Sequence, residues 1–245
     1  GNKANNFPSK GMYKVSVNCT NATGKWLYDE WRLSVQDITD TDVTCNIDFE
    51  TVTKTYFNNY IIGLKGLRQG TGQVVNEKGY RYEGLDPNNY VWFNNEYWRV
   101  IGVFDSTSHG QSGKNLVKLI RSEPIGAYSW NVTNNSNYVS SYVNKILTTS
   151  YYNATNGTSS GNCYSYYNTL TGNCDFTLTG LQADYRKMLV NATWHLGGIS
   201  AANLTIDTIY TQERGTTVYG SNPTTTTAHV GLMYPSDFGY SVLAD

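Results

Sequence analysis

The sequence predicts an α+β protein, in which a small N-terminal β unit precedes a larger domain with an antiparallel meander and two or three helices. Three observations support this class. Residues 79–104 read as a hairpin of two aromatic-rich strands joined at Asn94-Asn95, because asparagine tolerates the left-handed backbone of a two-residue turn. Residues 116–121 add a third strand to this meander. Residues 181–196 carry an apolar stripe at helical spacing.

The chain is predicted to contain two domains: a small β domain over residues 1–56 and the α+β domain over residues 57–245. In the small domain, apolar and polar residues alternate in three short runs, as in half-buried strands. These runs are residues 13–17, 31–35 and 43–49, with a turn at 21–24. Three short strands form only a small hydrophobic core, so we expect a disulfide to stabilise this domain.

The four cysteines fall into two well-separated sets, which predicts the local disulfides Cys19–Cys45 and Cys163–Cys174. The second bridge would close a short loop and stabilise the fold by roughly 2–3 kcal/mol through lost unfolded-state entropy. Four free buried thiols are the alternative. Metal binding is disfavoured, because neither set has a C-x-x-C spacing or a nearby histidine. The disulfides would imply an oxidising compartment.

Both faces of the hairpin strands are apolar, so we expect these strands to be buried on both sides near the centre of a sheet. The clearest helix is 181–196, because Thr179 and Gln182 would form a capping box at its start. The other expected elements are a short helix or connector over 56–67, a loop over 65–79, a polar loop over 105–114, helices over 140–152 and 206–214, and a strand over 229–234 followed by a turn at 235–237.

The composition favours an extracellular protein. Charged residues make up 15 % of the chain, against about 25 % in typical soluble domains, while tyrosine occurs 21 times. The net charge is −1 and no Lys/Arg stripe is present, which argues against a nucleic-acid partner. No apolar run approaches the roughly 20 residues of a membrane helix. If the protein is exported, we expect its targeting segment to have been removed upstream of Gly1.

No catalytic, cofactor-binding or metal-binding residue is predicted. His109, His195 and His229 lack the spacing of metal ligands; we expect His195 at a helix end and His109 in a polar loop. Ser112 superficially suggests a nucleophile elbow, but Lys114 occupies the position of the last glycine.

Two further groups of residues are candidates for ligand contacts. Asp37, Asp40 and Asp42 lack the glycine and glutamate of a calcium loop, so a solvated turn is favoured over a weak surface calcium site. The six tryptophans could form a platform for sugars, but core packing is favoured. Trp92 and Trp98 fit the core of the hairpin, Trp26 and Trp31 fit the small domain, and Trp130 and Trp194 have no assigned place.

Five segments occur in an order that is specific to one family. They are DPNNYVWFNNEYWRVIGVF (86–104), VKLIRSEPIGAYSW (117–130), YRKMLVNATWHLGG (185–198), ERGTTVY (213–219) and GLMYPSDFGYSVL (231–243). The chain from about residue 60 onward resembles a large uncharacterised family of exported proteins from gut-associated Firmicutes and relatives. The N-terminal unit looks like the small domain that often precedes it. The resemblance implies display at the cell surface and a loose likeness to C-type-lectin-like or sulfatase-modifying-factor-like folds, and it defines no catalytic residues.

The chain departs from that family at its end. Members continue past the SVL segment with more cysteine and tryptophan and finish on a strand resembling RPVLYL, whereas this chain stops at Asp245. The departure predicts a truncated second domain whose sheet has an open edge. Such an edge could be filled by another subunit, as in strand-addition assembly.

These observations together predict a non-enzymatic secreted or cell-surface protein, either adhesin-like or a fibre- or pilus-type subunit. Its partners would be other copies of itself or host and environmental glycans. A carbohydrate-binding module with a lectin-like fold is the alternative. An enzyme would need a pocket that gathers Asp, Glu or His from distant segments, which spacing in the sequence cannot reveal.

Overall fold

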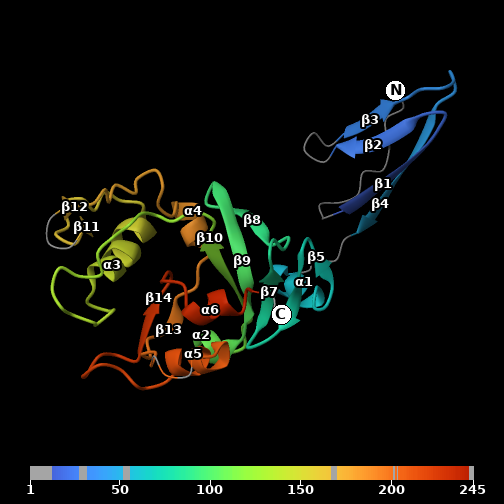
Figure 1. The fold of residues 1–245 in the computed structure, drawn as a ribbon. Helices are drawn as coiled ribbons and strands as arrows, with labels where there is room; N and C mark the ends of the chain where they lie inside the picture. Colours follow the sequence, from blue (N-terminus) through green and yellow to red (C-terminus); the bar gives the residue numbers. More distant parts are fainter. Residues whose placement is uncertain are drawn as a thin grey trace. The chain divides into compact units, whose positions relative to one another are not determined.

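Antiparallel strands and short helices confirm an α+β protein (Figure 1). The structure is a computed structural model that describes residues 13–27, 32–51, 56–166, 170–200, 202 and 204–242. The chain folds into two compact units, Gly1–Tyr56 and Phe57–Asp245. In the described part of the chain, no helix is long and apolar enough to cross a membrane.

In its described residues, the smaller unit contains two antiparallel strand pairs. Strand β1 (Tyr13–Thr20) pairs with β4 (Thr44–Thr51), and β2 (Thr23–Leu27) pairs with β3 (Arg32–Gln36). The predicted turn at 21–24 is shorter than expected, because β2 already begins at Thr23 after a left-handed Asn21. Trp26 is buried as predicted, whereas Trp31 lies outside the described residues.

A six-stranded antiparallel sheet organises the larger unit. Its strands are β5 (Arg68–Gln69), β6 (Gly72–Asn76), β7 (Tyr80–Gly84), β8 (Tyr90–Phe93), β9 (Glu96–Phe104) and β10 (Leu116–Arg121). The long strand β9 is central, with β10 on one side and with β7 and β8 on the other (Figure 1). The expected loop over 65–79 is wrong, because Gly70 adopts a left-handed backbone that turns β5 tightly into β6.

The β8–β9 hairpin turns at Asn94 and Asn95, as predicted, and both residues have positive φ, 55° and 60°. Trp98 is buried, but Trp92 is 58 % exposed. The expectation that both faces of the hairpin are covered is therefore wrong. Burial of the second face would need another layer of structure above β8, and the sequence of the strand cannot specify that layer.

The core of the larger unit lies against the hairpin and the sheet. One apolar cluster packs Phe93 and Trp98 against the helical segment formed by α3 (Tyr142–Lys145) and the π-helix η1 (Ile146–Tyr151), and it includes the Cys163–Cys174 disulfide. A second cluster packs the sheet against α1 (Phe57–Gly63). Helices predicted over 140–152 and within 56–67 are thus present.

The predicted helix over 181–196 is wrong. A single turn, α4 (Ala183–Arg186), is followed by strand β13 (Ala192–His195), which pairs with β14 (Thr225–Ala228). Gln182 is the N-cap, and its side chain makes no capping bond. The segment 192–195 contains a threonine and a tryptophan, which fit a strand well once β14 supplies a partner.

The remaining elements complete the larger unit. Helix α5 (Ile206–Glu213) begins after Thr205 as predicted, with Thr205 and Thr208 forming a capping box. The expected strand over 229–234 is wrong, since the strand lies earlier, at β14. The expected turn at 235–237 begins α6 (Pro235–Gly239), and the expected polar loop contains α2 (Ser106–His109). Strands β11 (Tyr164–Tyr166) and β12 (Leu170–Thr171) form a small hairpin.

Candidate functional site

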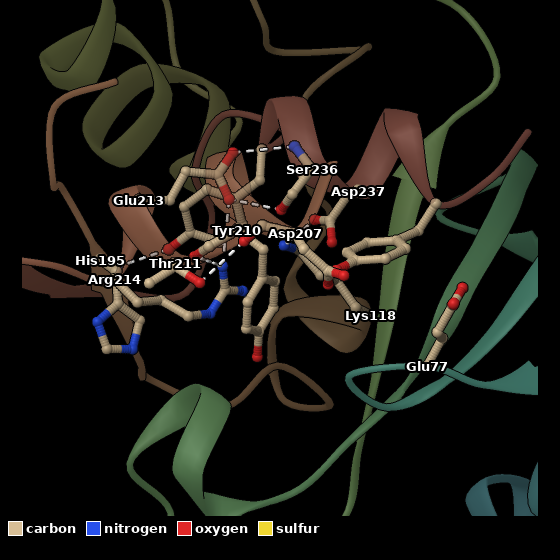
Figure 2. Close-up of polar contacts among 12 residues, drawn as sticks. Glu77, Lys118, His195, Asp207, Tyr210, Thr211, Glu213, Arg214, Ser236 and Asp237 are labelled. Carbon is tan, nitrogen blue, oxygen red and sulfur yellow. Dashed lines mark hydrogen bonds and ion pairs between the residues drawn. The ribbon is translucent and has the colours of Figure 1, made fainter. Parts of the chain in front are cut away.

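Charged side chains from three distant elements meet inside the larger unit (Figure 2). The Arg81 guanidinium lies 2.7 Å from one carboxylate oxygen of Asp237, and the Lys118 ammonium lies 2.5 Å from the other. Arg81 and Asp237 are each only 1 % exposed. Arg81 also lies between two aromatic rings, 4.6 Å from the centre of Phe104 and 4.8 Å from that of Tyr240. The cluster therefore connects β7, β10 and α6 through one buried carboxylate.

The surroundings of this carboxylate shift its pKa. Burial by itself would raise the pKa of Asp237, but the charges of Lys118 and Arg81 hold that pKa below its ordinary value. Burial lowers the pKa of Lys118, against the attraction of Asp237, which raises it. Because a buried charge is costly without partners, Asp237 needs both cations to remain ionised in this position.

A second buried carboxylate joins the ends of α5 and α6. Glu213, the last residue of α5, accepts hydrogen bonds from the backbone N–H of Ser236, at 2.9 Å, and from its hydroxyl, at 2.5 Å. Arg214 donates to the same carboxylate at 3.1 Å. Figure 2 shows how Glu213 reaches the first turn of α6. The carboxylates of Asp237 and Glu213 thus both accept hydrogen bonds from neighbouring donors, and the two side chains are at most 4 % exposed.

These groups lie beneath an open groove of about 320 Å³ on the surface of the larger unit. The groove contains exposed and half-buried aromatic rings, together with glycine backbone. Its principal lining residues are Trp130, Tyr138, Trp194, His195, Tyr219, Asn222, Met233 and Tyr234. A neighbouring hollow of about 650 Å³ shares Trp130 and Ser136 with it and adds the amides of Asn131, Asn134 and Asn135.

The Lys118 side chain contacts the inner rings of the groove. The Lys118 ammonium lies 4.3 Å from the centre of the Tyr234 ring and 5.1 Å from that of Trp194, as in cation–π contacts. The Tyr234 hydroxyl accepts from the backbone N–H of His195 at 2.6 Å, and burial raises the pKa of Tyr234 to about 12. Gly231 lies so close to Trp194 that a Cβ would be 2.8 Å from the ring.

The outer part of the groove is more open. Trp130 is 41 % exposed and Tyr219 is 82 % exposed. The Trp130 indole N–H donates to the carbonyl oxygen of Asn135 at 3.1 Å, and the Asn222 amide donates to the Ser136 hydroxyl at 3.0 Å. Among the described residues, those that line the groove and the hollow carry amide, hydroxyl, phenol, indole and imidazole groups, and none of them is Asp or Glu.

The structure brings together Trp130 and Trp194, the two tryptophans without an assigned place. His195 also lines the groove, but from a strand and not from the expected helix end. Burial and the charge of Arg214 lower the pKa of His195.

The other candidates lie elsewhere. His109 is buried, not in a polar loop: its Nδ1 accepts from the N–H of Gln111, which leaves Nε2 to donate to the carbonyl oxygen of Phe104. His229 stacks on Tyr152. Ser112 lies in an exposed turn. Asp37, Asp40 and Asp42 are exposed, and in the described residues no group of three His, Cys, Asp or Glu side chains could hold a metal ion.

Sequence reasoning missed the buried charges, Arg81, Lys118, Glu213 and Asp237. Their signal was present but weak. Lys118, Glu213 and Asp237 lie within the segments 117–130, 213–219 and 231–243, in a chain with few charges. A charged residue inside an apolar or aromatic segment is a candidate for a buried ion pair.

Comparison with protein-family models, with curated proteins and with solved structures finds no match to this chain. The resemblance to a family of exported proteins and the likeness to lectin-type folds therefore stay predictions.

Proposed function

We propose that this protein is a non-enzymatic, extracellular protein of adhesin type that binds glycans in the groove between Trp130 and Tyr234. The observation that carries the proposal is the combination of exposed aromatic rings with amide and hydroxyl groups in one concave surface. Sugar rings present apolar C–H faces that pack on aromatic rings, and their hydroxyl groups exchange hydrogen bonds with amides. Binding sites for small ligands commonly combine an apolar lining with a few polar groups in this way.

The lining supports binding over hydrolysis. Cleavage of a glycosidic bond canonically needs two carboxyl groups about 5–9.5 Å apart across the bond. Glu213 and Asp237, the carboxylates that contact the groove's neighbours Arg214 and Lys118, are buried and already accept from Ser236, Arg214, Arg81 and Lys118. A sugar in the groove would therefore meet stacking surfaces and hydrogen-bonding groups without an acid and base pair.

An extracellular location is supported by the two disulfides, Cys19–Cys45 and Cys163–Cys174. Disulfides persist in oxidising compartments and are rare in the cytosol of mesophiles. The low charge content and the many tyrosines favour the same location.

The test is a glycan array followed by titration calorimetry with the oligosaccharide that binds best. Tyr219→Ala and Trp130→Ala should each weaken binding at least tenfold, because loss of about 1.4 kcal/mol corresponds to a factor of ten. Tyr60→Ala is the matched control: Tyr60 is 54 % exposed in α1, outside the groove, and its loss should leave the affinity unchanged. An array without hits, or groove variants that bind like the parent protein, would rule out this function.

A further inference from the structure

Strand β8 has one edge that no described strand occupies. Val100 N–H donates to the carbonyl oxygen of Asn89 at 2.7 Å, and hydrogen-bonded residues alternate along an antiparallel strand. Asn89, Val91 and Phe93 therefore face β9, while the backbone groups of Tyr90 and Trp92 point away from it. In the part of the chain that the structure describes, β9 is the sole strand paired with β8.

Exposed aromatic side chains lie beside this edge, on the uncovered face of the β8–β9 hairpin. Tyr90, Trp92 and Tyr97 are 52 %, 58 % and 60 % exposed. Trp92 and Tyr97 lie opposite each other, with ring centres 5.0 Å apart, and the Arg99 guanidinium lies 4.7 Å from the centre of the Tyr90 ring. Proteins commonly protect an edge with lysine, proline or a bulge. Residues 90–93 contain neither lysine nor proline, and their register with β9 is regular.

We propose that β8 pairs with the β8 strand of a second copy of this chain, antiparallel about a two-fold axis at Val91. In this register Tyr90 lies opposite Trp92 of the second copy, and Trp92 lies opposite its Tyr90. The backbone N–H and C=O groups that point away from β9 then bond across the interface. The hairpins of the two copies become one continuous sheet.

A second copy fits this edge because the edge is complementary to itself. Cross-strand pairs of aromatic residues stabilise antiparallel sheets, and the two-fold axis creates the Tyr90–Trp92 pair twice. Across the joined sheet, Arg99 and Tyr90 of one copy would lie in line with Trp92 and Tyr97 of the second copy. Every cation in this surface thus meets an aromatic ring and no like charge. The contact uses the same surface on both copies, so it closes as a dimer and does not propagate into a filament.

The test compares the parent protein with Trp92→Pro and Trp92→Lys by sedimentation equilibrium over a range of concentrations. Proline at position 92 removes the indole ring and a backbone N–H that points away from β9, and it leaves the hydrogen bonds between β8 and β9 intact, so the hairpin should persist while pairing is lost. Both variants should raise the dimer dissociation constant at least tenfold. Tyr60→Lys, an exposed tyrosine replaced outside β8, should dimerise like the parent protein.

Amide hydrogen exchange gives a second measurement that does not depend on the variants. The N–H groups of Tyr90 and Trp92 should gain protection as the parent protein is concentrated, while the N–H of Tyr219 should not. A parent protein that is monomeric at every concentration would overturn the proposal. So would a dimer that neither Trp92 variant weakens, or filaments in electron microscopy. Glycan binding in the groove is measured separately, so either proposal can fail while the other stands.

Discussion

Lys118 and Asp237 are 119 residues apart in the sequence, yet the Lys118 ammonium lies 2.5 Å from the Asp237 carboxylate. The same ammonium lies 4.3 Å from the centre of the Tyr234 ring. One side chain thus connects the buried ion cluster to the surface groove. The Tyr234 ring in the groove and the Asp237 carboxylate thus share one cation as a partner.

Replacement of Asp237 should strongly destabilise the larger unit. In Asp237→Asn, Arg81 and Lys118 stay buried without their anionic partner, and breaking a buried ion pair costs about 3–5 kcal/mol. Urea unfolding followed by circular dichroism measures the change. The matched control is Asp184→Asn, because Asp184 pairs with Lys187 in an exposed contact and should show no measurable change. Equal stability of the two variants would contradict a supporting role for the cluster.

Low pH should lower the unfolding free energy of the protein through protonation of Asp237. The folded-state pKa of Asp237 is below its ordinary value of 3.8, so the unfolded chain binds a proton there more readily than the folded one. This contribution to stability is present above the ordinary pKa and is lost as the pH falls through the folded pKa. The unfolding free energy of the parent protein should therefore fall more steeply below about pH 4 than that of Asp237→Asn. Parallel pH profiles would show that Asp237 does not titrate in this way.

The disulfide in the larger unit should contribute substantially to its stability. Cys163 and Cys174 are 11 residues apart and both are buried in the apolar cluster against the hairpin. The double variant Cys163→Ser/Cys174→Ser should lose about 2–3 kcal/mol of unfolding free energy, as expected for a loop of this length. Peptide mapping without reductant should recover the two cysteines as one linked pair. Free thiols at these positions would remove the support for an oxidising compartment.

Replacement by glycine should change the unfolding free energy differently at the two asparagines of the hairpin turn. Both adopt the left-handed backbone that glycine accepts freely. The Asn94 side chain is buried, donates to the carbonyl oxygen of Gly180 and accepts from the N–H of Gln182, whereas the Asn95 side chain accepts from the Tyr185 hydroxyl in an exposed contact. Asn94→Gly should cost about 1–3 kcal/mol, because the Gly180 carbonyl oxygen and the part-buried Gln182 N–H both lose the Asn94 side chain as a partner. Asn95→Gly should be nearly neutral in the same thermal and urea unfolding measurements.

Local chemistry made several features predictable from the sequence. The Asn94-Asn95 turn needs a left-handed backbone, which few residues accept, so its position and the flanking strands follow from the residues themselves. The cysteine spacing indicated the pairs Cys19–Cys45 and Cys163–Cys174. The helix predicted over 206–214 begins where expected, and the structure shows why: the Thr205 side chain accepts from a backbone N–H in the first turn.

Tertiary structure decided the rest. The apolar pattern of residues 181–196 suits a helix, but β14 offers strand partners to residues 192–195, and these partners lie 30 to 36 residues away. Trp92 and Trp98 are similar in sequence context, yet one is exposed and the other buried, because burial depends on what packs above each face. The cluster of Arg81, Lys118 and Asp237 has only a weak local signal, because its partners lie far apart in the sequence. By itself the sequence determined the Asn94-Asn95 turn, the start of α5 and the cysteine pairs, which depend on a few neighbouring residues. The groove and the ion cluster beside it depend on contacts between distant segments, which form only when the chain is folded.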